Sequence, residues 1–307
     1  MHGYRVPLRD MRFVLHELLA GEPVTALPGC GDFTPELIDS VLEQAARLAE
    51  SELAPLNRSG DEEGCAYENG VVRTPRGFQA AYATFRAGGW TGVAAAPEWG
   101  GQGLPRLINL ALDEMFSSAN FSFATYPGLS QGAYDALARH GDQRLKSIFL
   151  PRLADGSWSG TMCLTEPQCG TDLGLIRSKA VPTGDGSFRV DGTKIFISAG
   201  EHDLTENIVH LVLAKLPDAP AGTRGISLFV VPKFLPEEES GGWGSGERNG
   251  VRCAGIEHKM GIRASSTCTM QFEGAVGWLV GAPHQGMAAM FTMMNAARLA
   301  VGIQGLA

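Results

Sequence analysis

The sequence predicts a multidomain α and β protein: an N-terminal all-α helical domain, then an antiparallel β-barrel-like domain, then the start of a C-terminal helical domain. Apolar residues recur at helical spacing up to Trp158, alternate with period two after it, and return to helical spacing at Pro283. The predicted divisions are an N-terminal arm at residues 1–33, a helical domain at 34–157, a β domain at 158–282, and the first helix of a truncated C-terminal domain at 283–307.

Composition places the chain among folded globular proteins. Of its 307 residues, 44% are hydrophobic and 19% charged, and the length is sufficient for roughly two domains. The 25 basic and 33 acidic residues give a net charge of −8, and the basic residues are scattered. No nucleic-acid partner is therefore expected.

Targeting and cysteine signals are weak. Charged residues interrupt the apolar residues of the N-terminus, and no stretch approaches the roughly 18 to 20 apolar residues of a membrane span. Cys163 and Cys169 are the nearest pair of six cysteines, and their spacing matches no common zinc motif. We expect a cytoplasmic protein with reduced thiols, no metal site and no membrane span.

The N-terminal third predicts two helices. Leu8 to Leu19 carries apolar residues at near-helical spacing, and a Gly- and Pro-containing loop follows at residues 21–31. Thr34 then supplies an N-cap before Pro35, and the apolar pattern continues to about Leu53. Residues 57–74 predict a loop or a small hairpin.

Four further helices are predicted in the helical domain. The first starts near Pro75 and ends at the Gly88-Gly89 pair. Residues 90–104 are dense in glycine and predict irregular backbone that packs closely against a neighbour. The remaining helices are expected at residues 105–119, 130–140 and 142–150.

The β domain starts with a hairpin signal. Asp191-Gly192 lies between the alternating segments 187–190 and 193–197, a pattern typical of a two-residue turn. Residues 236–250 predict a flexible surface insertion. Further strands are expected at residues 208–215, 225–231, 267–272 and 278–280.

The last helix is rich in methionine. Met287, Met290 and Met294 contribute to an apolar surface that needs a partner to cover it. No capping signal marks the end of this helix. We therefore expect a further C-terminal helical domain beyond residue 307.

Residues 161–172, TMCLTEPQCGTD, lie where the helical half meets the β half. Pro167 forces Glu166 into an extended bend, and residues 169–172 are typical of a turn. Such a loop offers backbone N–H groups and hydroxyls to a planar or phosphorylated ligand. An ordinary domain-joining turn is the alternative.

Several separated motifs occur together and in order: GWTGVAAAPEWGGQGLP, GAYDALARHGDQRLKSIFLPRLADGSWSG, LTEPQCGTD and TKIFISAG. With them, most of the chain resembles the flavin-dependent acyl-CoA dehydrogenase family. YRVPLRDMRFVLHELL, KMGIRASSTCTM and MFTMMNAARLAVGIQGLA are most similar to the branch of 3-methylmercaptopropionyl-CoA dehydrogenases. The resemblance implies FAD as cofactor.

Matching the family's motifs residue by residue implies a flavin site in the LTEPQCGTD loop. Leu164 and Thr165 would lie along the isoalloxazine, with Thr165 hydrogen-bonding near its N5/O4 edge. Gly170 and Thr171 would approach the FAD pyrophosphate, and Thr171 would also contact acyl-CoA. Met162 occupies a position that is often aromatic in relatives, where the residue stacks on the flavin.

Two other segments match family positions. Phe196, Ile197 and Ser198 correspond to an aromatic-Ile-Thr turn behind the flavin, with phenylalanine in place of the usual tryptophan. Arg298 corresponds to an arginine near the CoA phosphates, and Asn295 stands where an aspartate often contacts CoA. The alternatives are that Thr165 caps a turn, that Phe196 is a core residue and that Arg298 forms a surface ion pair.

The implied reaction is α,β-dehydrogenation of an acyl-CoA thioester to the trans-2-enoyl-CoA, which needs a carboxylate to remove the α proton. Relatives usually supply it as a glutamate in the C-terminal domain, so no catalytic residue is assigned here, and Glu166, Asp172 and Glu201 are not chosen. The implied partners are the acyl-CoA substrate, an electron-transfer flavoprotein or similar acceptor, and further copies in a homo-oligomer. A catalytically silent flavin- or acyl-CoA-binding subunit and an acyl-CoA oxidase are the alternatives.

Overall fold

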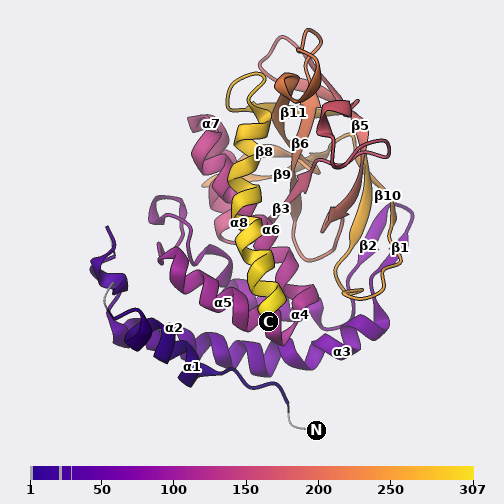
Figure 1. Cartoon of the computed structure of the whole chain (residues 1–307). Helices are drawn as coiled ribbons and strands as arrows, with labels where there is room; N and C mark the ends of the chain where they lie inside the picture. Colours follow the sequence, from indigo (N-terminus) through magenta and orange to yellow (C-terminus); the bar gives the residue numbers. More distant parts are fainter. Residues whose placement is uncertain (1–2, 21–22, 29) are drawn as a thin grey trace.

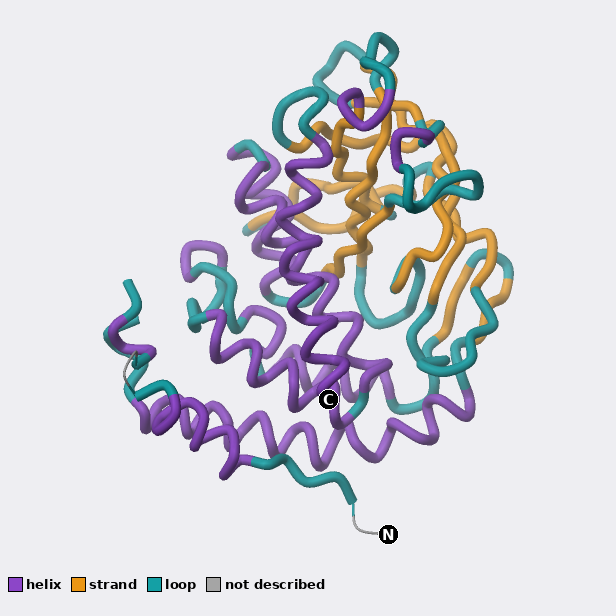
Figure 2. Tube along the Cα trace, viewed as in Figure 1, coloured by secondary structure: helices purple, strands orange, loops and turns teal. Residues whose placement is uncertain are grey.

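The computed structural model describes residues 3–20, 23–28 and 30–307; residues 21–22 and 29, within the predicted loop at 21–31, lie outside the described residues. Helices occupy one half of the molecule and strands the other (Figures 1 and 2). The last helix, α8 (Gly286–Leu306), runs along α6 (Phe121–His140), beside both halves. The order of helical half, β half and final helix is the predicted one.

The first N-terminal helix has about the predicted length, and the second is longer than predicted. α1 (Leu8–Arg12) continues into a π-helical turn, and α2 (Pro35–Leu48) continues through a second π-helical turn into α3 (Ala54–Glu63). The predicted loop is therefore wrong for residues 57–63. Pro55 follows the π-helical turn directly, and a proline inside a continuous helix commonly accompanies such an irregularity.

Thr34 caps α2, because its hydroxyl accepts a hydrogen bond from the N–H of Leu37 at 3.3 Å. We expect Thr34→Ala to lower the free energy of unfolding by about 1 kcal/mol. Ser59→Ala is the control, because the Ser59 hydroxyl bonds only to a carbonyl of its own exposed helix. Urea denaturation measures both variants, and equal losses would contradict a capping role for Thr34.

The rest of the helical half follows the prediction closely. Its elements are the small hairpin β1 (Ala66–Glu68) and β2 (Val71–Arg73), then α4 (Phe78–Ala87), α5 (Arg106–Ala119), α6 and α7 (Gln143–Ala154). Residues 90–104 are irregular apart from two short 3-10 turns, as expected. α6 begins earlier than predicted because the Asn120 side chain accepts the N–H of Phe123 at 3.0 Å and Pro127 is accommodated inside the helix.

A seven-stranded mixed sheet forms the β half. Its strands are β3 (Trp158–Cys163), β4 (Lys179–Pro182), β5 (Phe188–Ser198), β6 (Asn207–Lys215), β7 (Ile226–Pro232), β10 (Val251–Ile256) and β11 (Thr267–Val280). β6 pairs in parallel with β3 and with β4, and the other pairs are antiparallel. The antiparallel arrangement predicted is therefore correct for most strand pairs and wrong for these two. β4 and β6 share one residue pair, Lys179 with Lys215, so a closed barrel is not confirmed.

The hairpin predicted at Asp191-Gly192 is also wrong, because β5 runs straight through both residues. Gly192 has φ +153°, and a Cβ atom there would lie 2.1 Å from the Ser178 hydroxyl. The Asp191 carboxylate accepts the N–H of Gly274 at 2.7 Å. The glycine thus lets the chain that leads into β4 approach β5 closely. From the sequence alone, a glycine with this role cannot be distinguished from a glycine in a turn.

The surface insertion predicted at residues 236–250 contains a hairpin that the sequence did not indicate. β8 (Phe234–Glu239) pairs antiparallel with β9 (Gly242–Arg248). The Trp243 side chain packs against the core between helices and sheet, and its carbonyl accepts a hydrogen bond from Arg152. β4 and β10 were not predicted, and the two strands expected at 267–272 and 278–280 are the single strand β11.

α8 packs by a narrow face. Met290 and Met293 are buried, and Met293 contacts α6 where Gly132 leaves room: a Cβ atom at Gly132 would lie 2.8 Å from Met293 Cγ. Phe291, Leu299 and Val301 are exposed. Among the described helices, α8 alone is long and apolar enough to cross a membrane, with a mean hydropathy of 1.2. A single helix of this kind is weak evidence for a membrane span, and the sequence analysis did not predict one.

Candidate functional site

The loop after β3 is joined to the end of β5. Leu164 is buried, Thr165 half-buried, and Gly170 and Thr171 exposed. The N–H of Ile195 donates to the carbonyl of Thr165 at 2.9 Å, which places the loop directly beside Phe196. The structure therefore brings together two segments that the sequence assigned to one site.

An ion pair beneath the loop holds its shape. Lys194, completely buried in β5, donates to the carboxylate of Glu166 at 2.8 Å and to the carbonyl of Leu164 at 3.0 Å. The N–H and hydroxyl of Ser178 also donate to Glu166. Burial raises the pKa of Glu166, but Lys194 and the other donors outweigh it and lower that pKa to about 2. Glu166 is thus a structural carboxylate, as expected.

Several polar groups of the loop have no backbone partner. The N–H groups of Glu166 and Cys169 bond within the loop, whereas those of Thr165, Gly170 and Thr171 donate to no carbonyl in the described parts of the chain. Gly170 lies close to Thr165, because a Cβ atom there would be in ordinary van der Waals contact, 3.4 Å from the Thr165 methyl group. Neighbouring N–H groups without acceptors form a site for an anionic or acceptor-rich ligand.

Phe196 is exposed beside these donors. Its side chain is 58% accessible, so the alternative of a core residue is wrong. The residue lies at an irregularity of β5, opposite the register shift between Cys268 and Met270, and has φ +59°. A left-handed conformation at an aromatic residue costs of order 1 kcal/mol and is typical of functional sites. Ile197 is buried, and Ser198 pairs with Thr267 in the sheet.

Three other predicted positions behave differently. Met162 is half-buried and packs against the core between helices and sheet. Asn295 and Arg298 are exposed on α8, where Arg298 donates to the Asn295 side chain at 2.6 Å and its guanidinium lies 5.0 Å from the centre of the Phe291 ring. No contact among the described residues joins this pair to Thr171. The loop and the β5 turn thus lie together, and the α8 pair makes its side-chain contacts within its own helix.

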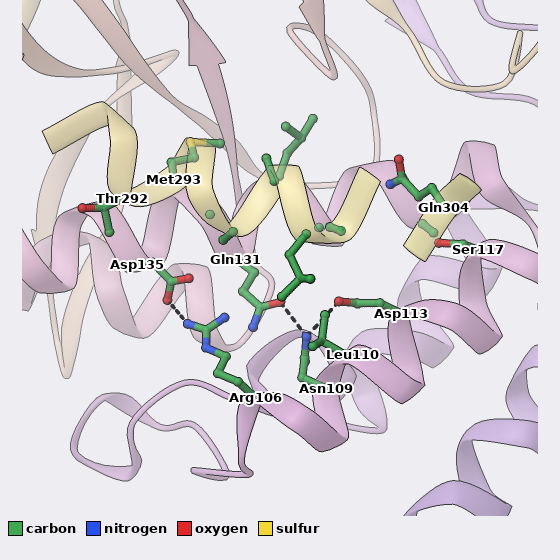
Figure 3. A pocket seen from close by; sticks show the side chains of 18 of the residues that line it. Arg106, Asn109, Leu110, Asp113, Ser117, Gln131, Asp135, Thr292, Met293 and Gln304 are labelled. Atoms are coloured by element: carbon green, nitrogen blue, oxygen red, sulfur yellow. Dashed lines mark hydrogen bonds and ion pairs between the residues drawn. The ribbon is translucent and has the colours of Figure 1, made fainter. Parts of the chain in front are cut away.

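A cavity of about 460 Å³ lies between α5, α6 and α8 (Figure 3). It was missed by the sequence analysis. We call it the helical cavity; its lining includes Leu110, Leu129, Met293, Asn109, Asp113 and Gln131. Two polar residues one turn apart, Asn109 and Asp113, on the otherwise apolar buried face of α5 were the signal that could have indicated it.

The helical cavity adjoins the strand that leads into the loop. Leu129 lines the cavity, and its carbonyl would lie 3.6 Å from a Cβ atom at Gly160 in β3. Residue 160 precedes the loop by four positions. The cavity and the loop therefore belong to one region of the molecule, connected through β3.

Comparison with known proteins assigns both halves of the chain. The family model described as "Acyl-CoA dehydrogenase, N-terminal domain" matches residues 36–157, and the one described as "Acyl-CoA dehydrogenase, middle domain" matches residues 161–275. The chain is 46% identical, over 99% of its length, to a 3-methylmercaptopropionyl-CoA dehydrogenase of Ruegeria pomeroyi, covering 51% of that protein. It is 38% identical, over its whole length, to a broad-specificity linear acyl-CoA dehydrogenase of Mycobacterium tuberculosis, again covering 51%.

Solved structures share the fold. An acyl-CoA dehydrogenase from Bacillus anthracis complexed with FAD superposes with a TM-score of 0.71 at 24% identity, over 89% of this chain and 42% of that one. Butyryl-CoA dehydrogenase from Megasphaera elsdenii superposes with a TM-score of 0.70 at 22% identity, over 88% of this chain and 64% of that one. The chain spans about half the length of the curated relatives it matches. The chain belongs to the acyl-CoA dehydrogenase family, of which it carries the N-terminal and middle domains.

Proposed function

We propose that this chain is the flavin- and acyl-CoA-binding part of an FAD-dependent acyl-CoA dehydrogenase that forms trans-2-enoyl-CoA. The observation that carries the proposal is the group of N–H donors at Thr165, Gly170 and Thr171 beside the exposed Phe196. The proposal is also supported by a relative, because the chain is 46% identical to a 3-methylmercaptopropionyl-CoA dehydrogenase.

The residues present fit FAD. Thr165 would donate to the acceptor edge of the flavin, and the N–H groups of Gly170 and Thr171 would face the pyrophosphate, because each lacks a carbonyl partner in the described structure. Phe196 offers an exposed aromatic surface to a planar ring. When bound, FAD supplies the two-electron acceptor that the dehydrogenation requires.

The acyl chain of the substrate would occupy the helical cavity. Its walls are largely aliphatic, and α8 passes along it and carries the exposed Arg298, the cation proposed for the CoA phosphates. Glu166 is unsuited to removing the α proton, since its carboxylate is buried and already bonded to Lys194. We place the base outside residues 1–307, and propose an electron-transfer flavoprotein as acceptor and assembly into a homo-oligomer.

Replacing Thr165 by valine tests the flavin site. Valine keeps the shape of the Thr165 side chain and its backbone N–H, and removes only the hydroxyl. We therefore expect an unchanged free energy of unfolding and about tenfold weaker FAD binding, because the hydrogen bond of the hydroxyl to the flavin is lost. Flavin fluorescence measures the affinity, and Thr84→Val, on the exposed face of α4, is the matched control. Equal losses of affinity and stability would make Thr165 structural. Failure of the unmodified chain to bind FAD would overturn the proposed cofactor.

A further inference from the structure

Three polar side chains in the wall of the helical cavity are bonded to one another. The side-chain NH₂ group of Asn109 donates to the Asp113 carboxylate at 3.0 Å and to the side-chain oxygen of Gln131 at 3.1 Å (Figure 3). We call these three residues the polar floor. Asn109 and Asp113 come from α5 and Gln131 from α6, whereas Met293, Ala297 and Ala300 of α8 line the cavity with apolar groups.

The hydrogen bonds of the polar floor determine which atoms remain available. Asn109 bonds to two acceptors through one NH₂ group, so the oxygen of Gln131 faces Asn109 and its NH₂ group is turned away. Among the described residues, that NH₂ group donates to no protein acceptor. A side-chain donor without a protein partner, at the wall of a cavity that is more apolar than polar, favours a ligand that brings a hydrogen-bond acceptor.

The charges around the polar floor disfavour an anion. Arg106, the cation nearest along α5, is already paired with Asp135. Asp113 forms no ion pair in the part of the chain that the structure describes, and burial raises the pKa of its carboxyl group to about 7. A carboxylate brought beside Asp113 would therefore meet a second carboxyl group while the nearby Arg106 is engaged. Arg139 also lines the cavity, but it lies eight residues beyond Gln131 on α6, about 12 Å along the helix.

We infer that the polar floor makes the helical cavity selective for acyl-CoA thioesters whose acyl chain ends in a neutral hydrogen-bond acceptor, such as a hydroxyl or ether oxygen. Simple alkyl chains of equal length leave the Gln131 NH₂ group without a partner, and chains ending in a carboxylate are repelled. This inference rests on the proposed function, because it takes the helical cavity as the acyl site. It identifies Gln131 as the residue that determines specificity.

Binding of matched thioesters to the unmodified chain tests the inference. Pentanoyl-, hexanoyl- and heptanoyl-CoA are compared with the ω-hydroxy thioesters in which a hydroxyl replaces the terminal methyl group, and with the corresponding ω-carboxy thioesters, by isothermal titration calorimetry. For the acyl chain whose end reaches the polar floor, we expect the ω-hydroxy thioester to bind about threefold to tenfold more tightly than the alkyl thioester of the same length. The ω-carboxy compound should bind most weakly.

Gln131→Leu is the decisive variant. It removes the donor at similar volume, so the alkyl thioester should bind at least as well as before and the preference for the hydroxy thioester should disappear. Retained alkyl binding also shows that the variant is folded. Gln143→Leu, at the exposed start of α7, should keep the preference.

Two failures are distinguishable. Equal affinities for alkyl and hydroxy thioesters in the unmodified chain, or a preference that survives Gln131→Leu, would overturn the inference and leave the proposed function intact. Absence of binding by every thioester would overturn the acyl-CoA site itself, and the inference with it.

Discussion

Replacing Lys194 by methionine is expected to lower the free energy of unfolding by about 3–5 kcal/mol, because it leaves the Glu166 carboxylate buried without its cation. Lys194 is completely buried and lies 2.8 Å from Glu166. The same substitution removes the donor that holds the carbonyl of Leu164. The loop that carries Thr165 and Thr171 should therefore loosen, and FAD affinity should fall together with stability.

Urea denaturation measures the loss, with Arg58→Met as the matched control. Arg58 pairs with Glu62 on an exposed helix surface, where removal of one partner costs under about 0.5 kcal/mol. The double variant Lys194→Met with Glu166→Gln should recover part of the loss, because no unpaired charge remains. A loss no larger than that of the control would contradict the structural role of the buried pair.

The pH dependence of the same variant has a definite sign. In the unmodified chain the pKa of Glu166 is lowered to about 2, so its contribution to stability is present above its ordinary pKa and lost as the pH falls toward 2. Without Lys194, burial raises that pKa, and protonation relieves the unpaired charge. The stability difference between the two proteins should therefore narrow as the pH falls from 7 to about 4.

Gly160→Val is expected to lower the free energy of unfolding by about 2–3 kcal/mol, through overpacking between β3 and α6. A Cβ atom at residue 160 would lie 2.3 Å from Cβ of Ala133 and 3.3 Å from Cα of Ser130. The N–H of Gly160 also donates to the Ser130 hydroxyl, so a displaced α6 would lose that bond. Since β3 and α6 connect the loop to the helical cavity, ligand binding at both should weaken.

Gly255→Val in β10 is the matched control for this variant. A Cβ atom there meets nothing within 4 Å, and the backbone needs no left-handed conformation. Valine in a half-buried strand position with free space around it should be neutral or slightly favourable. Thermal unfolding of the two variants compares them directly, and similar melting temperatures would contradict the packing argument at Gly160.

Local chemistry in the sequence predicted much of the fold. Thr34 before Pro35 indicated the start of α2, and the change of period at Trp158 indicated the passage from helices to sheet. Both predictions succeeded because they depend on neighbouring residues and on which face of an element is buried. The Asp191-Gly192 hairpin failed because Gly192 is needed for contact with Ser178, a residue of another segment.

The candidate site, too, was predicted from the sequence only in part. The motif around Thr165 and the Phe196 turn were found as separate patterns of residues, and their roles with FAD stay predictions. Their contact depends on the Ile195–Thr165 hydrogen bond and on Lys194 reaching Glu166, 28 residues away in the chain. No local pattern encodes a pair of that kind.

By itself, the sequence determined the order of helical and β segments and the loop with free donors, since turn chemistry and periodicity are local properties. Only the tertiary structure decided that Phe196 is exposed, that the sheet is mixed, and that Asn109 and Gln131 meet in the wall of a cavity. These features depend on which distant segments pack together. That packing is set by burial of apolar surface over the whole chain, and no short stretch of sequence specifies it.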